Sequence, residues 1–170
     1  DDWSFRRSKW FKNIEKECKN VKENVGLLDM TAFAKCRIKG PKAEEFLNKL
    51  VANKLPKKIG RINLCHALNT KGGVHSEFTI MREAEDSFYL VSAGAFQRLD
   101  HDWIHKWMPK DGSVQFENLT NSIGVLVVSG PKARTLMQKI SKTDFSNDKF
   151  KWLSAQNIDI GLAPCNAMRV

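Results

Sequence analysis

An acidic residue placed just after a glycine turn is the first feature of this sequence that could do chemistry. Glu77 follows the turn Asn69–Gly73 and enters the apolar run Phe78–Ile80. The two-residue period of a strand puts Glu77 and Thr79 on one face. A half-buried carboxylate needs a partner or serves a ligand. Glu77 is therefore either an exposed residue at a strand end or a ligand-binding group.

Histidines supply a second set of candidates. His101 and His105 stand four residues apart in a predicted helix, a spacing that can hold a metal ion on one helical face. They lie opposite the apolar stripe of that helix, which favours a solvent-exposed face over a metal site. His66 falls inside a predicted strand. The sequence does not decide between a position in the core and a position in a pocket.

The charge of the chain is strongly positive, with 28 basic and 19 acidic residues and a net charge of +9. The lysines are scattered and do not form one patch with interleaved aromatic residues, which argues against a nucleic-acid site. A solvated basic surface is favoured. Attraction of an anionic ligand such as a polyglutamylated folate is the functional alternative.

The four cysteines stand far apart, without any CxxC pair: Cys18, Cys36, Cys65 and Cys165. This spacing predicts reduced thiols and not a disulfide framework or a zinc site. Cys18 and Cys36 fall in apolar periodic patterns, where a thiol behaves as a small hydrophobic group. The longest apolar runs are too short to span a bilayer.

Helices and strands alternate in the first third of the chain. Apolar residues recur at helical spacing from Lys9 to Val25, and strand-like alternation follows over Phe33–Lys39. Gly40-Pro41 then opens a second helix that runs through Leu50, with proline in its first turn.

The middle of the chain is rich in strands. Arg61–Leu68 and Glu77–Arg82 flank the glycine turn and predict a hairpin, and Ser87–Ala93 forms the next strand. A further helix, ended by Pro109, is marked by an apolar stripe: Phe96, Leu99, Trp103, Trp107 and Met108.

One motif occurs twice. Ile38–Ala43 (IKGPKA) is echoed by Val128–Ala133 (VSGPKA), and an amphipathic helix follows each copy. We interpret this as an internal duplication in an α+β fold with two related lobes of mainly antiparallel sheet and packed helices. The first lobe, with the N-terminal helix, is predicted to span residues 1–112, and the start of the second spans 113–170. Because the chain stops inside a predicted strand, the second lobe is expected to be truncated and the fold incomplete.

Five motifs in order resemble one known family. They are Val25–Thr31 (VGLLDMT), Gly40–Leu47, Lys71–Val74, Phe88–Val91 and Val128–Ala133. Together they are similar to the aminomethyltransferase superfamily of glycine-cleavage T-proteins, over nearly the whole chain. Further segments resemble the folate-binding C-terminal region of dimethylglycine and sarcosine dehydrogenases more closely than the stand-alone T-protein: Arg6–Phe11, Ala52–Pro56 and Gly60–Ile62.

The resemblance implies a pterin pocket with a catalytic carboxylate just after the glycine turn, which here is Glu77. T-proteins have two aspartates at this point, whereas this chain has Ser76 and Glu77, which marks the dehydrogenase branch. The implied cofactor-binding residues are Phe33, Leu64, Val91 and Ser92. A T-protein asparagine falls on Ala93, so one polar contact is replaced.

The implied function is tetrahydrofolate-dependent transfer of an aminomethyl or methylene group, in a glycine-cleavage-like or a dimethylglycine- or sarcosine-demethylating enzyme. FAD would belong to an absent domain if the protein is a dehydrogenase. The implied partners are folate and a glycine-derived methylamine, or a lipoyl carrier protein for a true T-protein, without nucleic acid or membrane. The expected location is the cytoplasm, or the mitochondrial matrix in a eukaryote. The alternatives are a folate-binding RNA-modification or regulatory module without transferase activity, and a catalytically silent structural fragment.

Overall fold

A computed structural model describes residues 5–170 of the chain. Four α-helices and a short 3-10 turn (η1, Gly94–Phe96) occur within these residues. The helices are α1 (Phe11–Glu23), α2 (Ala43–Leu50), α3 (Gln97–Trp107) and α4 (Ala133–Ile140). The strands are β1 (Gly26–Asp29), β2 (Ala34–Lys39), β3 (Ile62–Leu68), β4 (Val74–Ala84), β5 (Ser87–Ser92), β6 (Gln115–Asn118), β7 (Leu126–Ser129), β8 (Ser154–Ile160) and β9 (Ala163–Arg169). None of the helices in this part of the chain is both long and apolar enough to cross a membrane. The predicted α+β class is confirmed.

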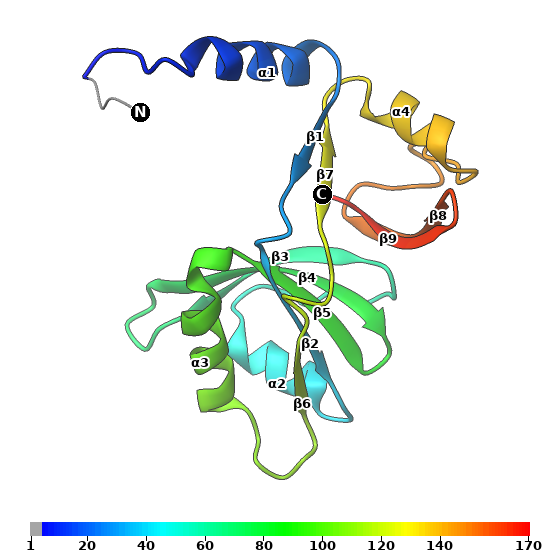
Figure 1. Ribbon diagram of the computed structural model, residues 1–170. Helices are drawn as coiled ribbons and strands as arrows, with labels where there is room; N and C mark the ends of the chain where they lie inside the picture. The colour runs from blue at the N-terminus through cyan, green and yellow to red at the C-terminus, as the bar shows by residue number, and fades with distance from the viewer. Residues whose placement is uncertain (1–4) are drawn as a thin grey trace.

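An antiparallel sheet of five strands in the order β3-β4-β5-β2-β6 forms the centre of the molecule. Both α2 and α3 cover the same face of this sheet (Figure 1). The predicted hairpin is confirmed, since β3 and β4 pair around the turn at Asn69–Gly73. Buried apolar side chains between the sheet and the helices form the main core, with Ile38, Leu47, Phe78, Ile80, Phe88, Leu90 and Ile104 among its least exposed members.

Helix α3 forms where the stripe predicts it, and Trp103 and Met108 of the stripe pack against the main core, but the most buried residues of the helix lie outside the stripe. Asp100 and Ile104 are its buried residues, whereas Phe96 and Leu99 are 57% and 46% exposed. Asp100 has a polar partner there, because Ser92 Oγ donates a 2.6 Å hydrogen bond to Asp100 Oδ2. Apolar spacing thus found the helix and part of its buried side, but not the buried Asp100.

Two pairs of strands are exchanged between the duplicated parts of the chain. β1 precedes the first Gly-Pro-Lys motif, yet it pairs with β7, which leads into the second motif. β6 precedes the second motif and pairs with β2, which leads into the first. Figure 1 shows β1 and β7 running side by side away from the five-stranded sheet. Strand pairing thus crosses residue 112 in both directions, and the division into lobes at that point stays a prediction.

The two Gly-Pro-Lys turns have the same geometry. Gly40 and Gly130 have φ values of 125° and 127°, a conformation that a residue with a Cβ rarely adopts. The carbonyl of each glycine accepts a hydrogen bond from the N–H of the first residue of the helix that follows, at 2.9 Å from Ala43 and 3.0 Å from Ala133. The duplicated motif therefore folds twice into the same strand, turn and helix.

The strand exchange is held by two equivalent threonine turns. Thr31 N–H donates to Asp29 Oδ1 at 2.9 Å, and Thr120 N–H donates to Asn118 Oδ1 at 3.0 Å. Each threonine hydroxyl then accepts a 3.1 Å hydrogen bond from a backbone N–H of the other copy, from Val125 to Thr31 and from Lys35 to Thr120. We call this reciprocal pair of turns the crossover.

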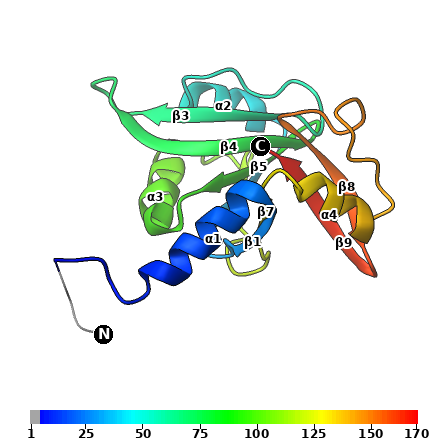
Figure 2. The same cartoon turned by 90° about the horizontal axis from the view of Figure 1, so that it is seen from above.

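Helix α1 has an apolar side that packs on no buried residue. Its bounds agree with the predicted helix, but none of its residues is buried, and it projects away from the sheet in both views (Figure 2). Of the two cysteines in apolar periodic patterns, Cys36 is buried and Cys18 on α1 is exposed. All four thiols are free.

Candidate functional site

The sheet face opposite α2 and α3 divides into a covered part and an open part. In the covered part, Ile62, Met81 and Tyr89 are buried on adjacent strands, where residues from the region of β8 and β9 pack on them: Leu153, Ala155 and Met168. The β8–β9 hairpin is joined to the five-stranded sheet by an isolated backbone bridge between Arg61 and Ser154.

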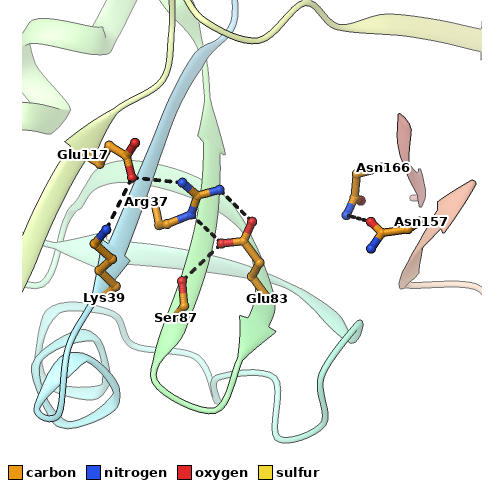
Figure 3. A network of polar contacts seen from close by, with 7 residues as sticks. All are labelled: Arg37, Lys39, Glu83, Ser87, Glu117, Asn157 and Asn166. Atoms are coloured by element: carbon orange, nitrogen blue, oxygen red, sulfur yellow. Dashed lines mark hydrogen bonds and ion pairs between the residues drawn. The ribbon is translucent and has the colours of Figure 1, made fainter. Parts of the chain in front are cut away.

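A polar network closes one end of this face. Arg37 Nη2 donates to Glu83 Oε1 at 2.8 Å, and Nη1 donates to Glu117 Oε2 at 2.9 Å (Figure 3). Ser87 and Lys39 complete the group, while Asn157 and Asn166 form a separate pair on the β8–β9 hairpin. The hydrogen bond with Arg37 lowers the pKa of Glu83. These charges satisfy one another, so this end of the face is structural.

The remaining part of the face is more accessible, although Val91 is half-buried and packs against the covered part. We call this remaining part the open face and define it by five residues: Leu64, His66, Glu77, Thr79 and Val91. Strand register places them together, because Thr79 lies opposite both Leu64 and Val91, and Glu77 lies opposite His66. Directly opposite residues in an antiparallel pair point to the same side of the sheet. Three of the five predicted site residues, Glu77, Leu64 and Val91, therefore share one surface.

Glu77 contacts a histidine on the neighbouring strand. Its Oε2 lies 2.9 Å from His66 Nε2, and the two side chains are 61% and 37% exposed. A carboxylate paired with an imidazole can accept a proton, hold a cationic ligand or stabilise developing positive charge. On these residues alone the site is an open surface and not an enclosed slot.

Phe33 stands in a tight turn just before β2. Its N–H donates to Met30 O at 2.9 Å, and its side chain is half-buried. The end of β5 passes close to this turn, because a Cβ on Gly94 would lie 1.9 Å from Ala32 O. Only glycine allows the two backbone segments to approach this closely. The structure thus brings the turn that carries Phe33 against the end of β5.

Ser92 lies apart from the other predicted residues. Its side chain points toward α3 and donates to the buried Asp100, on the opposite side of β5 from Val91. Asp100 Oδ1 has no hydrogen-bond partner within the described residues. Only the backbone of Ser92 is left to contact a ligand on the open face.

Lys35 is the neighbour of the open face that sequence reasoning missed. It lies opposite Val91 in the register, and its side chain is fully buried. Burial lowers the pKa of its ammonium group, and the negative charge of Asp29 acts in the opposite direction. Alternation along the strand assigns the position between Ala34 and Cys36 to the other face of the sheet, and lysine is seldom buried, so the sequence carried no signal for its burial.

The histidine pair on α3 makes ring contacts with β6. The rings of His101 and His105 lie 4.8 and 4.6 Å from the ring of Phe116, so this helical face is partly covered by β6 and not simply solvated. Burial lowers the pKa of His101. Nowhere in residues 5–170 do three or more potential ligand side chains gather as a metal site would require.

Two cavities of about 470 Å³ lie elsewhere on the molecule. One lies between α2, α3 and the β3–β4 turn and is lined by Phe46, Trp103 and Trp107, while the other surrounds the start of α3 near His101. None of the five predicted site residues lines either cavity. Neither cavity is therefore a candidate for the predicted chemistry.

Comparison with known proteins places this chain in a family. The sequence matches the profile described as the GCVT N-terminal domain over residues 2–170. It is 36% identical over 168 residues to mitochondrial dimethylglycine dehydrogenase of Rattus norvegicus, covering 98% of this chain and 20% of that protein. It is 31% identical over 169 residues to the mitochondrial pyruvate dehydrogenase phosphatase regulatory subunit of Mus musculus, covering 98% of this chain and 19% of that protein.

A solved structure shares the fold. The solved structure of the glycine cleavage system aminomethyltransferase T from Bartonella henselae superposes with a TM-score of 0.71 at 23% identity, over 82% of this chain and 37% of that one. At 23% identity this similarity is evidence for the fold alone. The chain spans about a fifth of the length of the curated relatives above.

Proposed function

Because the chain belongs to the GCVT N-terminal domain family, we propose that it forms the tetrahydrofolate-binding part of a one-carbon-transferring enzyme. The observation that carries the proposal is the open face, where one carboxylate, Glu77, stands beside apolar Leu64 and Val91 on three adjacent strands. A flat, partly apolar ring with cationic or hydrogen-bonding nitrogens suits this combination of groups.

Four of the five residues of the open face have a role in the proposal. Leu64 and Val91 contact the flat face of the pterin ring and exclude water from it. Glu77 stabilises positive charge that develops at the reacting nitrogen, or accepts the proton displaced there. His66 holds the Glu77 carboxylate through their 2.9 Å contact. Tetrahydrofolate, when bound, supplies the ring nitrogen that takes up the one-carbon unit.

The donor follows from the relatives and belongs to the proposal. A glycine-derived methylamine such as dimethylglycine or sarcosine is favoured, because the match to dimethylglycine dehydrogenase covers 98% of this chain. A lipoyl carrier protein would be the partner if the whole protein acts as a T-protein. FAD is assigned to no residue of this chain. The mitochondrial matrix is the proposed location in a eukaryote, since the dehydrogenase and the regulatory subunit are both mitochondrial by name.

The test is Glu77→Gln in the full-length protein. We expect oxidation of the methylamine to continue while methylene-tetrahydrofolate formation falls by roughly two to four orders of magnitude, because a fixed charge at the reacting nitrogen is lost. Product is measured by quenched-flow chromatography with tetrahydrofolate present.

The matched control for this test is Glu45→Gln. Glu45 pairs with Lys49 at 2.6 Å on α2, on the far side of the sheet, so this variant removes a similar charge away from the open face. Equal product yield in Glu77→Gln and the control would remove Glu77 from the mechanism.

One relative supports a second candidate function. The pyruvate dehydrogenase phosphatase regulatory subunit is a regulatory protein by name, so a folate-binding regulatory module without transferase activity fits the same family. The two functions differ in whether methylene-tetrahydrofolate is formed. Tetrahydrofolate binding by calorimetry, with no methylene-tetrahydrofolate formed from dimethylglycine, sarcosine or an aminomethylated lipoyl carrier, would favour the regulatory role.

A further inference from the structure

The two halves of the crossover carry different side chains at one matched position. Lys35 in the first half corresponds to Val125 in the second, since each donates its backbone N–H to the threonine hydroxyl of the other copy at 3.1 Å. Their carbonyls also match, because Leu119 N–H donates to Lys35 at 2.8 Å and Met30 N–H donates to Val125 at 2.9 Å. The backbone of the crossover therefore forms with valine as well as with lysine.

Lysine is an unfavourable choice at this position on stability grounds. Its side chain is fully buried, and its Nζ donates a single 2.7 Å hydrogen bond, to Thr31 O. Burial lowers the pKa of the ammonium, and Asp29 offsets this only in part. Burying a charge without a full set of partners is destabilising, and the valine of the other half avoids it. The ammonium therefore has a role beyond closing the crossover.

Lys35 lies next to both segments that border the open face, the turn that carries Phe33 and strand β5. Its ammonium holds the carbonyl of Thr31, two residues before Phe33 in the same turn. Its backbone lies opposite Val91 in the register of β2 and β5. Among the described residues the second half has no open face, because β7 pairs with β1 alone. The buried charge thus occurs only in the half that borders the proposed site.

We propose that Lys35 is a positioning residue of the folate site, which fixes the turn carrying Phe33 against Val91 so that the two side chains clasp the pterin ring. This inference rests on the proposed function. Lys35 does not contact the ligand itself, since it is covered on all sides.

The test compares Lys35→Val and Lys35→Met with a matched control in the full-length protein. Lys35→Val copies the other half of the crossover, and Lys35→Met keeps the length of the side chain without its charge. The control is Lys39→Met, on the same side of the same strand and outside the open face. Four quantities are measured. They are the calorimetric affinity for tetrahydrofolate, kcat and KM for methylamine oxidation, and the rate of hydrogen exchange at the Phe33 amide.

We expect both Lys35 variants to stay folded at 25 °C, to bind tetrahydrofolate about tenfold or more weakly, and to exchange the Phe33 amide faster. The rate of methylamine oxidation at saturation should not change, because no group of the oxidation site is altered. Lys39→Met should match the wild type in all four measurements.

Three outcomes would overturn the proposal. Tetrahydrofolate affinity within twofold of wild type in both Lys35 variants would refute it while leaving the proposed function intact. Loss of the fold in both variants would show that the ammonium is needed for folding and not for the site. Failure of the wild-type protein to bind tetrahydrofolate would refute the proposed function, and the role of Lys35 with it.

Discussion

The two halves of the crossover have the same backbone but different surroundings. β2 lies between β5 and β6 and buries Ile38 completely. β7 has only β1 beside it within the described residues, and none of its residues is buried. The duplicated sequence thus repeats the local turns, while the amount of buried surface depends on which strands lie next to each copy.

The largest expected difference between the halves is in the core. Ile38→Ala should lower the free energy of unfolding by about 2–5 kcal/mol, because it leaves a cavity between the sheet and α2. Val128→Ala, at the matched and half-buried position on β7, should cost about 1 kcal/mol. Urea unfolding measures both. Equal losses would show that the β1–β7 pair contributes as much to stability as the five-stranded sheet.

The threonine turns provide a smaller comparison. Thr120 is 9% exposed, so Thr120→Val leaves the N–H of Lys35 buried without an acceptor, at an expected cost of about 1–3 kcal/mol. Thr31 is exposed, and water replaces its hydroxyl in Thr31→Val, at about 0.5 kcal/mol. Amide exchange at Lys35 and Val125 reports each bond separately. A larger loss for Thr31→Val would contradict the assignment of the first half as the buried one.

The smallest expected difference is in pH dependence. Arg37 lies opposite Glu117 in the first half, where Leu28 and Val127 face each other in the second. Because Arg37 lowers the pKa of Glu83 in the folded state, this stabilisation is present above the ordinary glutamate pKa and is lost as pH falls through the lowered value. Arg37→Met should remove that loss of stability at acid pH, which is worth about 1 kcal/mol for a partly exposed pair.

Val127→Met is the matched control for the pH experiment. It changes the equivalent position on β7 without altering any charge, so its stability should vary with pH as in the wild type. Chemical unfolding at a series of pH values from 3 to 7 gives both curves. A pH dependence in Arg37→Met that still follows the wild type would assign the acid sensitivity to other carboxylates.

Much of the open face was predictable because it depends on local patterns. Alternation along β4 put Glu77 and Thr79 on one side of a strand, and the glycine turn set the hairpin that pairs Glu77 with His66. The family resemblance supplied Leu64 and Val91. Ser92 shows the limit of this reasoning, because its side chain is directed by Asp100 on α3, which no local pattern connects to β5.

Local sequence by itself determined the helices, the hairpin and the two Gly-Pro-Lys turns, because side-chain periodicity and glycine at positive φ act within a few residues. Only the tertiary structure decided the exchange of β1 and β6 and the burial of Asp100 and Lys35. Each of these depends on hydrogen bonds between segments far apart in the chain, such as Lys35 N–H to Thr120. A pattern read along one segment carries no information about the partner that completes it.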